Sequence, residues 1–368
     1  MSGNMAETRA DDSAGPVRKR LRIPIVRFKD VGRYNLETFR QQPLKEISGS
    51  LGDLGTLLPI MIALARQSST DGIPAISLSS TLIFAGIANI ATGFAFGIPL
   101  PVQPMKAIAS VALAQNFNHE EVASAGLFVA GVLGILSMTG LLEWFTRRIP
   151  IPVIKGIQIG AGFTLIMYAG TLLKVPTPYS QESVGWIIVA IVAFLLLLWN
   201  PLYPDLPYAL AVVVIGGLWT IIDIGEYNYD DLPLGLGLWK PHVFVPSPSN
   251  FRTGALEAGL GQIPLTTLNS VIAVCFLSRD LLPDVQAPSI TAVGLSVTAI
   301  NLVGCWFGMM PVCHGSGGLA AQYRFGAVCF SSPLSVFLLS SQITTFIHSG
   351  VKYKSKCSSR DLFLAFKR

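Results

Sequence analysis

Long apolar stretches separated by short polar turns make up the chain from about residue 44 onward. An α-helix needs about 20 predominantly apolar residues to cross the hydrocarbon core of a bilayer, and many of the stretches approach this length. A polar, basic segment over residues 1–43 precedes them and is expected to be a mobile cytoplasmic tail. The pattern predicts membrane spans near residues 46–65, 77–97, 98–116, 122–145, 152–173, 184–200, 207–223, 256–278, 289–307, 308–324 and 328–347.

The composition supports a membrane protein. Of the 368 residues, 51% are hydrophobic and only 13% are charged, and the mean hydropathy is +0.56. A soluble domain carries about a quarter charged residues, because its surface must be covered by groups that water tolerates. We therefore expect an all-α, multi-pass integral membrane protein, in the plasma membrane or in an internal membrane such as the vacuolar or mitochondrial one.

The distribution of charge predicts the orientation. The net charge of +5 arises largely in the N-terminal tail. Because cytoplasmic loops are rich in Lys and Arg, this tail and the turn that holds Arg147, Arg148 and Lys155 are assigned to the cytoplasm. The loop over 224–255 then lies outside. A nucleic-acid-binding arm is disfavoured because the basic run adjoins a membrane span. Five cysteines without a CxxC spacing predict no metal site, and no cofactor is expected.

Two of the predicted spans cannot be continuous helices. Residues 97–104 contain three prolines, and residues 309–318 contain one proline followed by three glycines after His314. Proline excludes or kinks an α-helix, and extended backbone at membrane depth is tolerated only where protein buries it or a cavity adjoins it. Each segment precedes a helical stretch, Met105–Gln115 or Leu319–Phe325. The pattern therefore predicts an extended segment followed by a half-helix, twice.

These two breaks belong to an internal repeat. Thr56 and Thr266 lie 210 positions apart (266 − 56), and so do Pro101 and Pro311 (311 − 101). An odd number of predicted spans separates equivalent points, so the copies cross the membrane in opposite senses. Paired interruptions in an inverted repeat are a sequence indication of a transport site. The predicted units are a first repeat over 44–223, the loop over 224–255, the start of a second repeat over 256–327 and a divergent C-terminal segment over 328–368.

The half-helix starts suggest what the site binds. Each start offers unpaired N–H groups and a partial charge of about +0.5, which suits a tetrahedral dianion. Lys106 would add a full positive charge. Gln103 is expected to cap the first half-helix, with Pro104 at its first position. The glycines within 315–318 would let backbone amides approach a ligand, and the alternative is that they only allow close helix packing.

Other polar residues join this set. Asp53 lies within an apolar span, where it would pair with Lys106, carry a proton or simply cap a broken helix. Polar residues near Gln262 form the matching set of the second repeat, although threonines there could bond their own helix instead. His314 is a ligand contact, a proton donor or a packed histidine. Neighbours on a strand point to opposite faces, so Cys313 and His314 predict no catalytic pair and no enzyme. The candidate substrate-binding residues are Asp53, Thr56, Gln103, Met105, Lys106, Gln262, Thr266, Thr267, Asn269, His314, Gly315, Ser316 and Gly317.

Four segments carry a family resemblance: residues 49–56 (GSLGDLGT), 101–107 (PVQPMKA), 262–270 (QIPLTTLNS) and 313–324 (CHGSGGLAAQYR). At these segments the chain resembles the eukaryotic molybdate transporters, relatives of the sulfate permeases, over about residues 44–327. The resemblance implies the seven-plus-seven inverted-repeat fold of sulfate and uracil permeases, with core and gate domains. It also implies uptake of molybdate, and no C-terminal regulatory domain of the kind that sulfate permeases carry.

The sequence is expected to depart from that pattern after Ala327, where a serine-rich segment leads to a basic tail. An alternative splice or an altered reading frame would explain the departure and would leave the second repeat incomplete. The alternatives to a molybdate carrier are therefore a sulfate or other oxyanion carrier, a nucleobase permease, or a truncated partner that does not transport. Proton coupling and a homo-oligomer stay open at this point.

Overall fold

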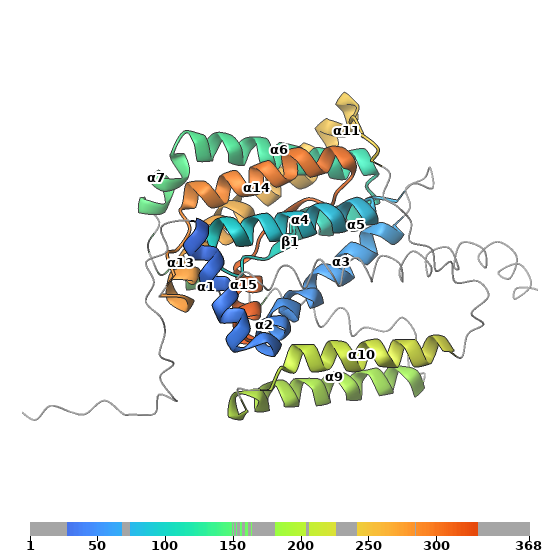
Figure 1. The fold of residues 1–368 in the computed structure, drawn as a ribbon. Helices are drawn as coiled ribbons and strands as arrows, with labels where there is room; N and C mark the ends of the chain where they lie inside the picture. The colour runs from blue at the N-terminus through green and yellow to red at the C-terminus, as the bar shows by residue number, and fades with distance from the viewer. Residues whose placement is uncertain are drawn as a thin grey trace, which may run out of the picture.

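The computed structural model describes residues 28–67, 74–148, 181–203, 206–225, 241–283 and 285–329, with a few single positions between 150 and 163. Helices make up most of this part of the chain (Figure 1). Five helical stretches in it are long and apolar enough to cross a membrane, and each coincides with a predicted span. The prediction of an all-α, multi-pass membrane protein is confirmed. The five stretches are Pro43–Ala65, Leu78–Phe96, His119–Met138, Pro248–Leu281 and Ile290–Phe307.

Two predicted segments are wrong in part. Residues 28–41, expected to belong to a mobile tail, form helix α1 (Phe28–Gln41). The predicted span over 122–145 is divided into α6 (His119–Met138) and α7 (Leu141–Arg148). Gly140 separates these two helices in a left-handed conformation with φ of 72°, which glycine adopts without steric cost. The predicted spans over 152–173 and 328–347 fall outside the described residues except at a few positions.

Polar residues just before the apolar runs begin the helices. The Ser77 hydroxyl accepts the Ser80 amide at the start of α4 (Leu78–Phe96). Asn118 and Glu121 form a reciprocal capping box at the start of α6. Such caps satisfy N–H groups that have no partner within the helix, so the sequence sets these boundaries locally. Ser289 caps α14 (Ile290–Gly304) in the same way.

Two of the membrane stretches are irregular rather than straight. The first contains a short 3₁₀ turn, and the second has two π-helical segments flanking Pro264, which cannot donate a backbone hydrogen bond. The first stretch runs through α2 (Pro43–Ser50), η1 (Leu51–Asp53) and α3 (Leu54–Arg66). The second runs through α11 (Pro248–Thr253), η4 (Gly254–Gly259), α12 (Leu260–Leu265), η5 (Thr266–Ala273) and α13 (Val274–Leu281).

The two predicted breaks form a pair of short strands. Strand β1 (Val102–Pro104) pairs antiparallel with β2 (Val312–His314), and Gln103 lies opposite Cys313. Each strand follows a left-handed glycine, Gly97 (φ 67°) or Gly308 (φ 73°), and these glycines lie 211 positions apart (308 − 97). The described residues thus contain the same turn, strand and short helix twice. The full seven-plus-seven count stays a prediction.

Each short helix packs against the first helical stretch of the other half. Helix α5 (Lys106–Gln115) contacts α12 and η4, and α15 (Ser316–Arg324) contacts α2 and η1. These approaches are close. A Cβ atom added at Gly52 would lie 2.7 Å from the Phe325 ring and 3.0 Å from the Ala321 carbonyl oxygen. The short helices therefore pack crosswise between the halves, whereas β1 contacts α3 and α4, and β2 contacts α14 and η5.

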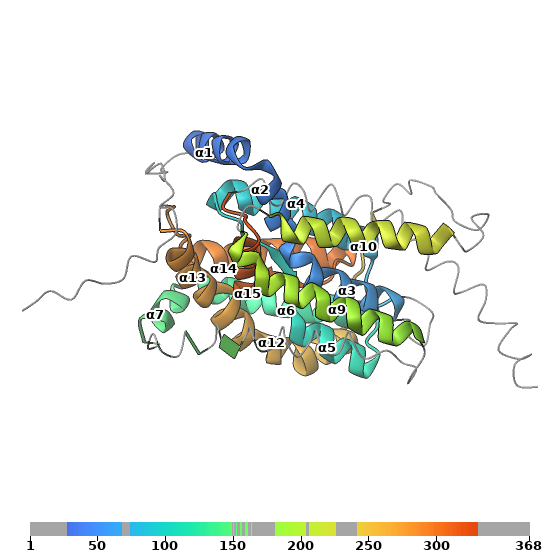
Figure 2. The same ribbon diagram turned by 90° about the horizontal axis from the view of Figure 1, so that it is seen from below.

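Helices α9 (Gln181–Trp199) and α10 (Tyr208–Gly225) lie along one flank of the molecule (Figures 1 and 2). Helix α10 packs on α2 and η1, and the Tyr208 hydroxyl donates to the Ala193 carbonyl. Many of their Leu, Ile and Val side chains are exposed. Exposed apolar side chains of this kind suit a surface that faces lipid.

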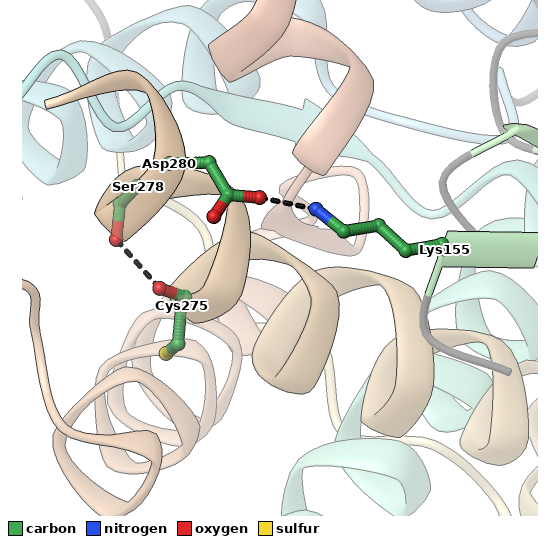
Figure 3. A network of polar contacts seen from close by, with 4 residues as sticks. All are labelled: Lys155, Cys275, Ser278 and Asp280. Atoms are coloured by element: carbon green, nitrogen blue, oxygen red, sulfur yellow. Dashed lines mark hydrogen bonds and ion pairs between the residues drawn. The ribbon is translucent and has the colours of Figure 1, made fainter. Parts of the chain in front are cut away.

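An ion pair joins two segments far apart in the sequence. The Lys155 ammonium contacts the Asp280 carboxylate at the end of α13 (Figure 3). Ser278 in the same turn donates to the Cys275 carbonyl at 2.9 Å. Because Lys155 belongs to the turn assigned to the cytoplasm, the pair is consistent with α13 ending on that side.

Candidate functional site

The two half-helices begin at opposite ends of the strand pair. Helix α5 starts at Lys106, two residues after β1, and α15 starts at Ser316, two residues after β2. Because the strands are antiparallel, the helices run away from the pair in opposite directions. Their positive N-terminal ends therefore both point toward the strands. The sequence predicted two extended segments, each followed by a half-helix, and the antiparallel pairing of the strands comes from the structure.

A buried carboxylate lies beside β1. One oxygen of Asp53, at the end of η1, accepts hydrogen bonds from the Thr56 hydroxyl at 2.7 Å and from the side-chain amide of Gln103. Asp53 is 6% exposed and Gln103 is 2% exposed. The sequence named these three residues as candidates on separate grounds, and the structure brings them into direct contact. Lys106 interacts electrostatically with Asp53 and Cys313, and no direct ion pair between Asp53 and Lys106 forms among the described residues.

The Gln103 carboxamide also lies against the start of α15. A Cβ atom added at Gly315 would lie 1.6 Å from the Gln103 side-chain oxygen, and one at Gly318 would lie 2.3 Å from its nitrogen. Only glycine leaves room for the amide at both positions. Gly315 precedes α15 as its N-cap, and Gly317 is the second residue of that helix. The glycines predicted to admit a ligand thus admit a side chain of β1 in this conformation.

The start of α5 is satisfied differently. The Gln262 side-chain oxygen accepts the Ala107 backbone amide at 2.9 Å, and its nitrogen donates to Thr266 at 2.9 Å. Gln262 is 1% exposed and Thr266 is fully buried. The predicted polar set of the second repeat therefore bonds to the half-helix of the first. The corresponding acidic position in the first repeat is Asp53, so the two halves match in shape and differ in charge.

The π-helical segment η5 supplies the remaining polar contacts. Asn269 accepts a hydrogen bond from the Ser316 hydroxyl at the first residue of α15. Ser270 donates to the Cys313 sulfur at 3.0 Å. The Thr267 hydroxyl is buried without a hydrogen-bond partner among the described residues. A π-bulge re-aims side chains within a helix, and here the polar residues of one segment reach both β2 and α15.

His314 lies apart from this cluster. It pairs with Val102 in the sheet, on the face opposite to Gln103 and Cys313. Its ring nitrogens contact the Ser296 hydroxyl at 3.0 Å and the Pro101 carbonyl at 3.2 Å, and it is fully buried. Of the three roles expected for His314, the geometry favours the packed, satisfied histidine.

The start of α5 corrects one prediction. Pro104, expected at the first helical position, is the last residue of β1, and Gln103, expected as the cap, is the middle residue of that strand. Met105 occupies the N-cap position without a side-chain hydrogen bond. Its amide donates to the Pro311 carbonyl at 2.9 Å, which extends the strand pairing by one bond. Because residues 102–104 pair as a strand, α5 begins two residues later than predicted, at Lys106 instead of Pro104.

Two asparagines hold the strands in place and were missed from the sequence. The Asn89 side chain in α4 accepts the Val102 amide at 2.9 Å. The Asn301 side chain in α14 accepts the Val312 amide at 2.8 Å and donates to the Val312 carbonyl at 2.6 Å. The signal available in the sequence was a lone polar residue inside each of two apolar spans. Asn89 and Asn301 lie 212 positions apart (301 − 89), which is close to the 210-position offset of the two breaks.

A small pocket opens against Asp53. Its lining also includes Asn89 and Gln322, and it has room for roughly one water-sized sphere, about 10 Å³. A cavity of this size accommodates a water molecule and no larger anion. The larger space between β1 and the start of α15 is filled by the Gln103 side chain in this conformation.

Comparisons with known proteins agree with this geometry. The fold resembles that of the transmembrane domain of a cyanobacterium bicarbonate transporter, BicA, with a TM-score of 0.51 and 16% identity over 85% of this chain and 86% of that one. The described part of the chain therefore has the fold of a multi-pass membrane domain of this kind, with two broken segments that meet at the strand pair. Identity this low supports the fold alone.

Sequence comparison is more specific. The family described as "Molybdate transporter of MFS superfamily" matches residues 45–165 and 254–351. Molybdate transporter 2 of Arabidopsis thaliana is 38% identical over 335 residues, which is 80% of this chain and 69% of the relative. Molybdate transporter 1 of the same plant is 36% identical over 321 residues, with 77% and 68% covered. The chain belongs to the molybdate transporter family. The family match ends at residue 351, and the departure expected after Ala327 stays a prediction.

Proposed function

We propose that the chain carries molybdate across a membrane, binding it between the starts of α5 and α15 beside the strand pair. The observation that carries this proposal is the convergence of two positive helix ends on one buried polar cluster. Family membership supports the same substrate. Transport would proceed as the half-helices and strands rock against the remaining helices, exposing the site to each side in turn.

The charge balance supports an oxyanion. Two helix starts contribute about +1 in total, and Lys106 adds a full charge. Asp53 offsets one of these charges in its ionised form. With a dianion bound, the net charge of the site would therefore be close to zero when Asp53 is protonated and about −1 when Asp53 is ionised.

A flat nucleobase fits this cluster less well. Recognition of a base calls for aromatic stacking and for amides that match its edge. Gln103 faces the start of α15 and is already bonded to Asp53. The residues around it contribute hydroxyl, amide and glycine backbone groups, which suit the several oxygens of a tetrahedral anion. Sulfate has the same shape and charge, so it is the main competitor.

The test is uptake of labelled molybdate by cells that express the full chain, with sulfate and uracil as competitors. We expect saturable uptake above that of untransfected cells, inhibited strongly by unlabelled molybdate and weakly or not at all by uracil. Inhibition by uracil without inhibition by oxyanions would contradict the proposal. Binding of molybdate to the purified protein without flux would instead support a sensor or a partner protein.

A further inference from the structure

The Gln103 carboxamide fills the space that the proposed oxyanion needs. Its oxygen lies where a side chain at Gly315 would begin, and its nitrogen lies where one at Gly318 would begin. Its nitrogen also donates to Asp53 and lies 3.4 Å from the Thr56 hydroxyl oxygen. One side chain thus contacts both the start of α15 and the buried carboxylate.

We propose that Gln103 is a stand-in ligand that the oxyanion displaces, and that its departure from Asp53 couples oxyanion binding to the uptake of one proton. This inference rests on the proposed function and identifies Gln103 as the positioning residue that links the two events. While Gln103 donates to Asp53, it stabilises the ionised carboxylate. When a dianion takes its place, Asp53 loses a donor and gains a negative neighbour. Both changes raise the affinity of Asp53 for a proton.

The groups around Asp53 indicate that Asp53 is the one that takes up the proton when Gln103 is displaced. Among the described residues, the ionisable groups that act on it are Lys106 from α5 and Cys313 from β2. Helices α4 and α15 contribute the neutral Asn89 and Gln322 to the adjoining pocket. His314 lies on the other face of the strands. The pocket beside Asp53 has room for about one water molecule, which would deliver the proton.

The experiment measures molybdate binding to the purified full chain between about pH 5.5 and 8, together with proton uptake in weak buffer. For wild type we expect uptake of close to one proton per molybdate. The dissociation constant should rise with pH by up to about tenfold per unit where coupling is complete. Asp53→Asn should bind molybdate with no pH dependence and no proton uptake. Gln103→Met, which keeps length without the amide, should bind more tightly and take up a smaller fraction of a proton.

Gln262→Met is the matched control, because it makes the same chemical change at the buried glutamine that bonds the start of the other half-helix, α5. It should keep the wild-type pH slope whatever it does to affinity. A wild-type dissociation constant independent of pH, or an unchanged slope in Asp53→Asn, would overturn the inference while leaving molybdate binding intact. Absence of molybdate binding by wild type at every pH would overturn the proposed function itself. If a variant fails to fold, the wild-type slope and proton count still decide.

Discussion

Lys106 is the residue whose charge matters most for the proposed anion site. It begins α5, is partly buried, and acts electrostatically on both Asp53 and Cys313. A charge-assisted hydrogen bond contributes about 1.5–3 kcal/mol, so Lys106→Ala should weaken molybdate binding by about ten- to a hundredfold. Lys106→Arg should restore binding only in part, because a planar guanidinium does not replace a compact ammonium. Equilibrium binding of labelled molybdate would measure both. Equal affinity of wild type and Lys106→Ala would remove Lys106 from the site.

Gly315 and Gln103 should behave as a coupled pair. The three atoms closest to a Cβ added at Gly315 all belong to Gln103. Gly315→Ala alone should therefore destabilise the protein by about 1–3 kcal/mol, as overpacking does in other cores. Adding Gln103→Ala should remove most of that cost, since it removes the atoms that clash. A thermal denaturation series on wild type, both single variants and the double variant would give the coupling free energy. Strictly additive effects would show that the two positions do not touch.

At the scale of residues, several candidates named from the sequence lie in contact, although the sequence did not predict which atoms would meet. Asp53 was named as an ionisable residue in an apolar span, Gln103 as a residue at the helix break and Thr56 from the repeat, and the three meet. Asn89 and Asn301 were missed because their role depends on strand amides that only the folded chain brings near. His314 faces the other side of β2, and its partners Ser296 and Pro101 come from elements that spacing alone cannot align.

At the scale of elements, close helix crossings depend on particular glycines. A Cβ added at Gly254 in η4 would lie 2.2 Å from the Glu121 carbonyl oxygen of α6, whereas one at Gly261 in α12 would meet nothing within 4 Å. Gly254→Ala should therefore lower the melting temperature markedly, because backbone atoms cannot yield as a flexible side chain can. The cost should reach or exceed about 1–3 kcal/mol. Gly261→Ala, seven residues further on, serves as the control.

The control should be neutral or slightly stabilising, since alanine favours a helix over glycine by up to about 1 kcal/mol. Melting curves of both variants in the same detergent would make the comparison. Equal melting temperatures for the two would mean that α6 and η4 are not packed as closely as described.

The elements themselves were predicted from apolar length and from proline. Those signals are strong, because a bilayer requires about 20 apolar residues for each span and proline breaks helices wherever it falls. The division of one predicted span at Gly140 was missed, because the sequence does not show that this glycine adopts a left-handed conformation. Glycine is also common inside membrane helices. The π-helical segments were not predicted either. The segment η5 packs against β2 and α15, which only the folded chain brings beside it.

At the scale of the whole molecule, the Lys155–Asp280 contact is consistent with the turn after α7 and the end of α13 lying on one side of the membrane. The loop region around Phe244, which precedes α11, should lie on the opposite side. Single cysteines at positions 155, 280 and 244, in a chain whose native cysteines are replaced, should report this through a membrane-impermeant thiol reagent. Positions 155 and 280 should label together and position 244 from the other side. Labelling of 155 and 280 from different sides would contradict the packing.

The crosswise packing of the two halves also bears on how the protein is made. Helix α5 leaves the ribosome early, but its partners α12 and η4 begin more than 130 positions later in the chain. The 3₁₀ turn that contains Asp53 likewise packs against α15, which begins more than 260 positions later in the chain. Until residue 314 has been synthesised, β1 lacks the strand with which it pairs. Folds that depend on such distant contacts form slowly and expose intermediates prone to aggregation. The insertion machinery should therefore need to protect the nascent first half from aggregation. The anion site should form only late in synthesis, once both halves are present.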